Sequence, residues 1–268
     1  METIILNDRS IIEISGEERK KFLQGLITNN VEKVNSTNLL YSVMLSPQGK
    51  FLYDFFIFES NETLFLDCFS ARRDEIIKKL NFYKLRSKVV ILKNDELKVA
   101  QNLEGDESKV NFIFNDPRHK SLGKRIYFKN LTSDFSAERL NYDFVRISNK
   151  IAESELDLTF DKSFILEFNF DNLNAIDYEK GCYVGQELTA RTHYRGEIRK
   201  KLCHITIENL AEVEKNQEIS CEGKSVGIVL SSLFYQNKLH ALALIRLENF
   251  AENIDKLELE KNKVSIVL

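Results

Sequence analysis

A short run in the second half of the chain carries the side chains best suited to chemistry. Residues 178–203 read YEKGCYVGQELTARTHYRGEIRKKLC and hold three of the ten glycines in the chain. Glycines often stand where a backbone needs unusual dihedral angles or a close approach to another group. Cys182 lies between two of these glycines, two residues after Lys180 and shortly before a helix predicted over residues 186–191. A nearby cation and a helix N-terminus both stabilise a thiolate, so Cys182 is the first candidate for a reactive group.

The same run is basic within a slightly acidic chain. Residues 180–201 include six basic and two acidic side chains, whereas the whole chain has a formal net charge of −3. Such a stretch indicates an anion-binding site. The alternative is a set of charges that only faces solvent, and for residues 199–201 taken alone this alternative is the better interpretation. For Cys182 taken alone, the competing reading is a small buried hydrophobe. His193 is a candidate base for the thiol only if the fold brings the two together.

Length and composition set the class of protein. The chain has 268 residues, about two domains at ~150 residues each, and its 43% hydrophobic and 29% charged residues are typical of a globular protein. Its longest apolar run, residues 241–245, is far shorter than the ~20 residues of a membrane-spanning helix, so no membrane partner is expected. A pI of about 5.9 argues against a dedicated nucleic-acid binder. The four cysteines and four histidines are scattered, so neither a disulfide framework nor a metal site is predicted.

The first part of the chain predicts strands and helices that can hold the basic run in place. Residues 39–45 and 51–58 are apolar strands joined by Ser46-Pro47-Gln48-Gly49, and the positions of Pro and Gly there suit a type I turn and a β-hairpin. A helix carrying Ile76, Ile77, Leu80 and Tyr83 follows. Residues 88–92 are expected to form a buried strand. This alternation predicts an α+β fold.

The character of the sequence changes near residue 200. Five short apolar segments separated by turns follow this point, which predicts a small barrel or sandwich of strands. We therefore expect one domain over residues 1–200 and a second over 201–268.

A family resemblance rests on Lys180-Gly181-Cys182-Tyr183-Val184-Gly185-Gln186-Glu187 followed by Arg191. This run is similar to the signature of the YgfZ/GcvT-like folate-binding proteins, and its extension through residues 188–202 most resembles the mitochondrial and α-proteobacterial branch. Further similar blocks are found at residues 14–17, 22–25, 28–29, 46–54, 83–89, 142–146 and 227–231. The chain departs from the family pattern where Lys150-Ile151-Ala152 replaces a common Gly-Ile-Pro and where Ile165 replaces a proline.

The resemblance implies a GcvT-like aminomethyltransferase fold, with two interleaved α+β subdomains in residues 1–200 and a C-terminal small β-barrel in 201–268. It also implies that tetrahydrofolate, or another reduced folate, binds in a central cavity. Carboxylates accept paired hydrogen bonds from a pterin ring, and Asp54 and Glu167 are the expected acceptors. Arg191 or Arg195 would bind the anionic tail.

Other residues would line the folate site. Tyr183, Gln186 and Glu187 are expected to contact the folate, and Phe51, Phe56 or Tyr183 to form its apolar walls. Each assignment has a structural alternative. These are a surface salt bridge for either carboxylate, an ion pair with Glu187 for Arg191, and core packing for Tyr183.

The function implied is that of an accessory factor for the assembly or repair of iron–sulfur clusters in client enzymes. Cys182 would be the essential thiol, with Lys180 beside it in a catalytic role, and the partners would be folate, assembly proteins and client enzymes. One alternative is a folate-dependent one-carbon transferase acting on RNA or a small amine, which needs a carboxylate such as Asp54 to move a proton. Another is a scaffold with a vestigial cavity. The expected location is the bacterial cytoplasm, or the mitochondrial matrix for a processed organellar protein.

Overall fold

The computed structural model describes residues 3–102, 110–130, 139–246, 248 and 256–267. The chain divides into two units, and each is built from two separate stretches of sequence. The first unit contains residues 1–138 and 172–186, and the second contains residues 139–171 and 187–268. The chain therefore crosses between the units three times. The interleaving that the resemblance implied lies within residues 1–200, whereas these units divide the whole chain and the second unit includes the barrel.

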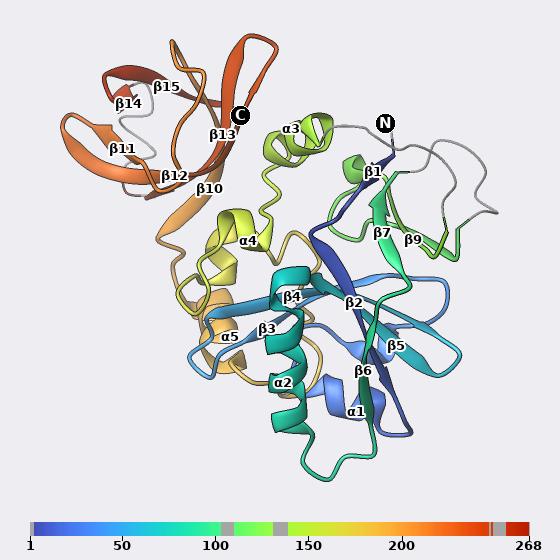
Figure 1. The fold of residues 1–268 in the computed structure, drawn as a ribbon. Helices are drawn as coiled ribbons and strands as arrows, with labels where there is room; N and C mark the ends of the chain where they lie inside the picture. The colour runs from blue at the N-terminus through green and yellow to red at the C-terminus, as the bar shows by residue number, and fades with distance from the viewer. Residues whose placement is uncertain (1–2, 103–109, 131–138, 247, 249–255, 268) are drawn as a thin grey trace. The chain divides into compact units, whose positions relative to one another are not determined.

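The first unit is built on two antiparallel sheets (Figure 1). The five-stranded sheet has the order β3 (Leu40–Leu45), β4 (Phe51–Ser60), β5 (Thr63–Phe69), β2 (Arg9–Ser15) and β6 (Val90–Asn94). The four-stranded sheet has the order β1 (Ile4–Ile5), β7 (Lys98–Gln101), β9 (Lys124–Phe128) and β8 (Phe112–Asn115). The helices are α1 (Arg19–Gln24) and α2 (Arg73–Lys84), with short 3-10 helices at Val31–Lys33, Ser70–Arg72 and Lys120–Leu122.

Aromatic side chains hold the two sheets together. The ring of Phe58 on β4 lies 4.9 Å from that of Phe65, 4.8 Å from that of Phe112 and 4.5 Å from that of Tyr127, centroid to centroid. Such pairs each contribute about 0.5–1.5 kcal/mol beyond the area that they bury. Since Phe112 and Tyr127 come from β8 and β9, Phe58 ties both sheets into one core.

The predicted hairpin is confirmed. Strands β3 and β4 pair in antiparallel register, and the amide of Gly49 donates to the carbonyl of Ser46 at 2.8 Å across the turn. Gly49 has a φ of +73°, which a residue with a side chain rarely adopts.

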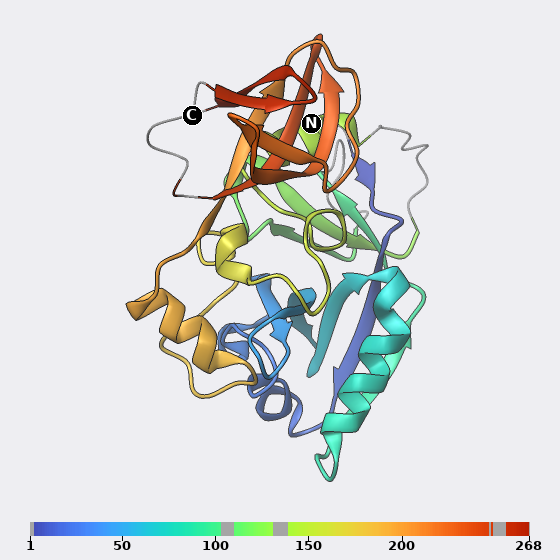
Figure 2. The same ribbon diagram turned by 90° about the vertical axis from the view of Figure 1, so that its left-hand side faces the viewer.

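The sequence predicts a buried strand over residues 88–92. A strand is found there, but the prediction that it is buried is wrong. Strand β6 forms, but it lies at the edge of the five-stranded sheet, and Val90 and Leu92 are exposed. A four-residue apolar run does not distinguish a central strand from an edge strand. Helix α2 packs beside this edge, against β2 and β6, through the buried side chains of Ile76 and Leu80 (Figure 2).

The second unit contains a closed six-stranded barrel, which confirms the predicted barrel. Its strand order is β10 (Lys200–Ile207), β13 (Lys238–Arg246), β12 (Lys224–Tyr235), β11 (Glu218–Cys221), β14 (Leu257–Leu259) and β15 (Asn262–Val267). Alternate residues of β10, such as Cys203, Ile205 and Ile207, belong to the barrel core. The helices of this unit with both ends in the described residues include α3 (Leu140–Ser148), α4 (Ser154–Asp157), a 3-10 helix at Ile165–Phe168, and α5 (Gln186–Arg195), whose first residue falls in the first unit.

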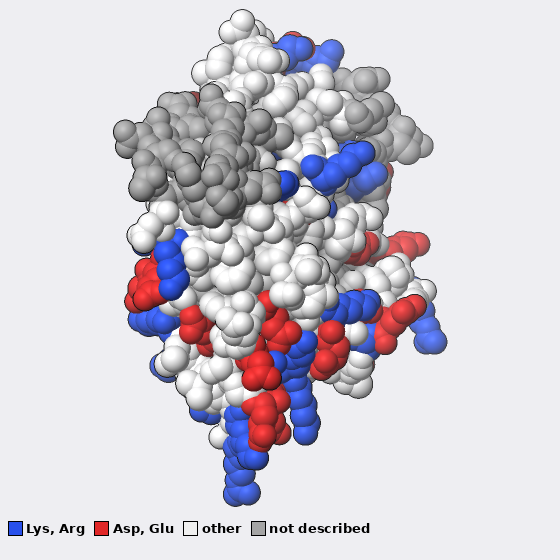
Figure 3. All heavy atoms as spheres, turned by 90° about the vertical axis from the view of Figure 1, so that its right-hand side faces the viewer, with Lys and Arg blue, Asp and Glu red and all other residues white. Residues whose placement is uncertain are grey.

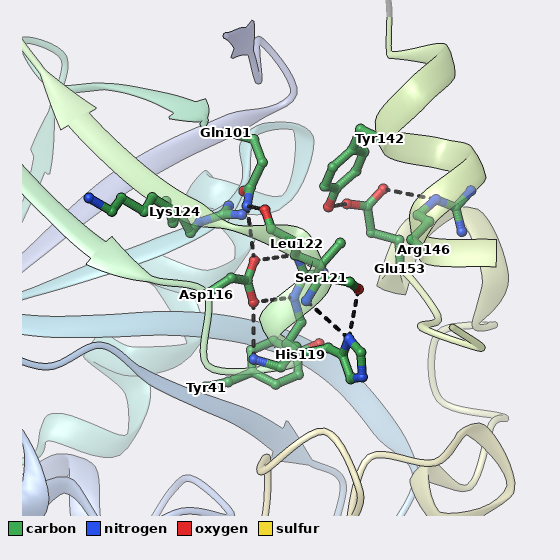
Figure 4. Close-up of polar contacts among 12 residues, drawn as sticks. Tyr41, Gln101, Asp116, His119, Ser121, Leu122, Lys124, Tyr142, Arg146 and Glu153 are labelled. Carbon is green, nitrogen blue, oxygen red and sulfur yellow. Dashed lines mark hydrogen bonds and ion pairs between the residues drawn. The ribbon is translucent and has the colours of Figure 1, made fainter. Parts of the chain in front are cut away.

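A buried arginine fastens the helical segment of the second unit. Arg146 on α3 contacts the carboxylates of Asp143 at 2.7 Å and Asp157 at 3.0 Å. Glu153 lies 3.9 Å from Arg146 and accepts a hydrogen bond from the Tyr142 hydroxyl, as Figure 4 shows. Asp157 also accepts a hydrogen bond from the backbone of Ser231 on β12, which attaches this segment to the barrel.

The expected domain boundary at residue 200 coincides with the start of β10. The division into units falls elsewhere, because residues 139–171 pack on the barrel and residues 172–186 pack with the first unit. None of the described helices is long and apolar enough to span a membrane.

Two histidines on the barrel predict an acid-sensitive stability. His204 Nε2 lies 2.9 Å from His240 Nδ1, and burial, together with this neighbour, lowers the pKa of His204 to about 4. Between about pH 6.5 and pH 4 the unfolded chain binds a proton that the folded barrel does not. The free energy of unfolding should therefore decrease by about 1–2 kcal/mol as the pH is lowered through this range. Urea unfolding followed by circular dichroism at about pH 7 and about pH 4.5 measures this loss. His204→Gln should reduce it, and an unchanged loss in that variant would contradict the assignment.

Candidate functional site

The loop that carries Cys182 is clamped by Lys180. Lys180 is 7% exposed, and its ammonium donates to three carbonyl oxygens, those of Gln24 at 2.7 Å, Ile27 at 2.6 Å and Asn29 at 2.8 Å. Burial lowers the pKa of Lys180 to about 8. Since all three N–H bonds of the ammonium are used, Lys180 has the geometry of a positioning residue for the Cys182 loop.

Gly185 allows the far end of the loop to lie against the β3–β4 hairpin. Its φ is +82°, and a Cβ atom there would lie 2.4 Å from the Ser46 carbonyl oxygen and 2.8 Å from the Leu45 Cβ. The neighbouring amide of Val184 donates to the carbonyl of Gly25 at 3.1 Å. Only glycine fits this contact without movement of the hairpin.

The segment that leads into the loop is held by side chains from residues 28 and 29. The Thr28 hydroxyl donates to the Ala175 carbonyl at 2.6 Å, and the Asn29 amide donates to the Asn174 carbonyl at 2.7 Å. The loop is therefore fixed on both sides of Cys182 by contacts to the chain that follows α1.

Cys182 is the accessible thiol of the chain. It is exposed, whereas Cys68, Cys203 and Cys221 are buried, and all four are free. Burial raises the pKa of the Cys68 thiol to about 12 and that of Cys203 to about 11, so neither forms a thiolate readily. Within the described ranges, no group of three or more His, Cys, Asp or Glu side chains could hold a metal ion.

The aromatic residues expected to wall the folate lie in the core. Phe51 and Phe56 are fully buried, and Tyr183 is almost so. The Lys180 Nζ lies 5.0 Å from the centre of the Tyr183 ring, and burial raises the pKa of that phenol to about 12. This arrangement matches the alternative reading of Tyr183 as a packing residue beneath the clamp.

Asp54 is buried and already engaged inside the first unit. It is 3% exposed, accepts a hydrogen bond from the Tyr41 hydroxyl at 3.1 Å and lies 3.5 Å from the Arg9 guanidinium. Arg9 in turn contacts Asp67 at 2.7 Å. The alternative of a surface salt bridge for Asp54 is therefore excluded, because the pair is buried.

Three arginines surround the neighbouring Phe56 ring. The guanidinium carbons of Arg9, Arg118 and Arg125 lie 5.4, 4.8 and 3.8 Å from its centre. Asp116 holds Arg118 in place through contacts of 3.0 and 2.8 Å, and Gln101 reaches the same carboxylate at 3.5 Å (Figure 4). Sequence reasoning missed this network, because its members come from strands and turns far apart in the chain.

The remaining candidates of the second unit keep their polar groups available. Glu167 lies in the 3-10 helix Ile165–Phe168, and desolvation raises the pKa of its partly buried carboxyl despite the opposing charge of Lys200. Arg191 and Glu187 are exposed on α5 and form no ion pair with each other, so the alternative of a structural pair is not found. Gln186, the last residue of the first unit, begins α5, and its backbone amide donates to the Tyr183 carbonyl at 3.2 Å. Asp54 and Cys182 thus belong to the first unit, and Glu167, Glu187 and Arg191 to the second.

Removal of the clamp should destabilise the first unit. Lys180→Met keeps the length of the side chain but leaves three buried carbonyl oxygens without their donor, so we expect a loss of about 2–4 kcal/mol in the free energy of unfolding. Denaturant unfolding measures the loss. Lys21→Met is the control, because the Lys21 side chain is exposed and its contact with Glu18 is 3.8 Å long. Equal stability of the two variants would contradict the role of the clamp.

The chain is similar to proteins from fungi, an amoeba and mammals, whereas no model of a known protein family matches it. It is 34% identical over 222 residues to a protein of Mycosarcoma maydis (74% of this chain, 55% of the relative) and 31% identical over 255 residues to one of Dictyostelium discoideum (75% and 62%). It is 29% identical over 231 residues to one of Homo sapiens (74% and 64%). All three bear the name iron-sulfur cluster assembly factor IBA57, mitochondrial, or that of its homolog.

The fold is similar to that of the glycine cleavage system aminomethyltransferase T from Bartonella henselae. The TM-score is 0.74 at 12% identity, over 99% of this chain and 84% of that one. The chain belongs to the YgfZ/GcvT-like family. The likeness confirms the GcvT-like fold with its C-terminal barrel, and at this identity it speaks for the fold alone. This YgfZ/GcvT-like chain spans 54 to 65% of the length of the curated relatives that it matches.

Proposed function

We propose that the chain binds a reduced folate such as tetrahydrofolate and supports the assembly or repair of iron–sulfur clusters in client enzymes, with Cys182 as the essential thiol. The observation that carries the proposal is the single exposed cysteine, held on a clamped loop, in a relative of proteins named as iron-sulfur cluster assembly factors. Its partners would be assembly proteins and the client enzymes. Because the three relatives are named mitochondrial, we place the chain in the mitochondrial matrix if it is a processed organellar protein, and in the bacterial cytoplasm otherwise.

The chemistry of the loop suits a thiol that meets another protein or a cluster. Iron is bound by thiolate sulfur, and an exposed cysteine can offer that sulfur without opening the fold. The contacts of Lys180 and Gly185 hold the backbone on either side of Cys182. Because the loop is already ordered, little conformational entropy is lost when the thiol engages its target.

The residues of the second unit fit a folate in part. Glu167 has a carboxylate that could accept the N–H donors of a pterin, since it forms no ion pair with any described residue, and Arg191 and Arg195 are exposed for the anionic tail. Gln186 and Glu187 follow the thiol loop in sequence, and we propose both as folate contacts on the family resemblance alone. Asp54 already contacts Tyr41 and Arg9, so it would contribute to folate binding by orienting these two side chains. A bound folate supplies a carrier for one-carbon units.

A one-carbon transferase is the less favoured function. It needs a carboxylate free to move a proton beside the folate. The burial of Asp54 and its contacts with Tyr41 and Arg9 suit a structural or orienting carboxylate better than a proton shuttle.

Titration of tetrahydrofolate into the protein by calorimetry tests the folate part of the proposal. Glu167→Gln should weaken binding about tenfold or more, because it loses a charge-assisted acceptor. The same change should leave the melting temperature equal or slightly higher, because it removes a carboxylate that desolvation disfavours. Affinity should also fall on acidification at a higher pH than for an ordinary glutamate. Glu212→Gln, in an exposed loop, is the control. No heat of binding with the unaltered protein would refute folate binding.

A further inference from the structure

The C-terminal half of α2 and the chain that follows it are strongly basic. Residues 76–94 contain six lysines and arginines and no aspartate or glutamate. Lys88 pairs with Glu17, and Lys93 lies 2.6 Å from Asp74. The other four cations form no ion pair with any residue that the structure describes, and they are Lys78, Lys79, Lys84 and Arg86.

Two large apolar side chains stand exposed among these cations. Phe82 is 75% exposed and Leu85 is 87% exposed, the two highest values for a large apolar residue in the described part of the chain. Lys78, Phe82 and Leu85 are spaced four and three residues apart, so they follow one stripe along α2 and its end. Isolated apolar side chains on a surface are ordinary, but a pair within a basic cluster is typical of an interaction site.

The backbone at Leu85 is strained in a way that glycine would relieve. Its φ is +45° and its ψ is −107°, and the amide of Ser87 donates to the carbonyl of Lys84 at 2.8 Å. This is the geometry of a type II′ turn, whose first central position is normally glycine. A leucine here costs stability through its backbone and again through its exposed side chain, so folding alone gives no reason for it.

We propose that this end of α2, the α2 tip formed by Lys78, Phe82, Leu85 and Arg86, docks on an anionic lipid surface. The turn between α2 and β6 projects beyond the sheet of the first unit (Figures 1 and 2). In the space-filling view the corresponding lower end carries cationic side chains at its lowest point, with acidic side chains beside and above them (Figure 3). A convex tip with apolar side chains at its point and cations around them matches a plane of acyl chains beneath anionic headgroups. It does not match the groove that a peptide would require.

Docking of the α2 tip on lipid would give the chain a membrane partner, contrary to the expectation from its sequence. It concerns contact with a surface, and it is independent of folate and of Cys182. Glu17 and Glu18 lie near the tip, where Glu17 pairs with Lys88 and Glu18 accepts a hydrogen bond from the Lys88 backbone amide.

Sedimentation with lipid vesicles tests the proposal. The protein should bind phosphatidylcholine vesicles in which roughly a third of the lipid is phosphatidylglycerol, and should not bind pure phosphatidylcholine. Binding should weaken when the ionic strength is raised from about 0.1 M to about 1 M, because the screening length falls from about 10 Å to about 3 Å.

Leu85→Gly separates docking from folding. Glycine suits the φ of this position, so the melting temperature should stay equal or rise, while vesicle binding should weaken about tenfold or more. The double charge reversal Lys78→Glu with Arg86→Glu should weaken binding at least as much. The matched controls are Phe234→Ser and the pair Lys162→Glu with Lys238→Glu, all exposed in the second unit, and they should bind as the unaltered protein does.

Either of two results would overturn the proposal. One is that the unaltered protein stays in solution with the anionic vesicles. The other is that the α2 tip variants bind as tightly as the controls, which would mean that the exposed leucine serves another partner, such as an acidic protein.

Discussion

Cells that carry Cys182→Ala in place of the unaltered protein are expected to lose most of the activity of their dependent iron–sulfur enzymes. The side chain is exposed, so the melting temperature and the affinity for tetrahydrofolate should stay close to those of the unaltered protein. The loss would then come from the sulfur atom itself, because iron is bound by thiolate and alanine offers no substitute. Activity of the client enzymes in cell extracts measures the effect.

Two comparisons make this result specific to the thiol. Glu179→Ala changes another exposed side chain of the same loop and should leave the client enzymes active. Cys182→Ser retains the size of the residue and should fail as alanine does. Normal client activity in the alanine variant would remove Cys182 from the proposed function.

Gly185→Ala should cost about 2–4 kcal/mol of folding free energy. The added Cβ would lie 2.4 Å from the Ser46 carbonyl oxygen, and alanine rarely adopts a φ of +82°. Either the hairpin turn or the Cys182 loop must then move. We therefore expect a lower midpoint in denaturant unfolding, and loss of client enzyme activity even where the protein remains folded.

Gly181→Ala is the matched control for this substitution. Gly181 lies four residues earlier on the same loop, and a Cβ atom there would meet no atom within 4 Å. Its stability should stay within about 0.5 kcal/mol of that of the unaltered protein. Equal losses at the two glycines would show that the loop is not seated on the hairpin.

Local patterns in the sequence predict much of this fold. The Ser46-Pro47-Gln48-Gly49 turn, the helix carrying Ile76 and Leu80, and the barrel strands after residue 200 form as expected. Each depends on neighbours a few residues apart, which turn chemistry and periodicity report directly. The predicted burial of β6 is wrong because local patterns do not report the order of strands in a sheet, which depends on pairings between distant residues.

The sequence predicts which residue types make up the candidate site, but it does not predict their contacts. The glycines and Lys180 around Cys182 indicate a special loop, but the clamp itself joins Lys180 to carbonyls more than 150 residues earlier in the chain. The engagement of Asp54 by Tyr41 and Arg9 also depends on the packing of separate strands. A carboxylate near a strand gives no sign of whether it meets a ligand or another side chain, so the network became visible only in the structure.

The most direct test of the account is the rate at which iodoacetamide alkylates Cys182, followed by mass spectrometry with and without tetrahydrofolate. Cys68, Cys203 and Cys221 are buried and serve as internal references in the same sample. Of the four thiols, Cys182 alone should react quickly, and tetrahydrofolate should slow its reaction about tenfold or more by covering the thiol. An unprotected Cys182 at a folate concentration that saturates calorimetric binding would contradict this prediction.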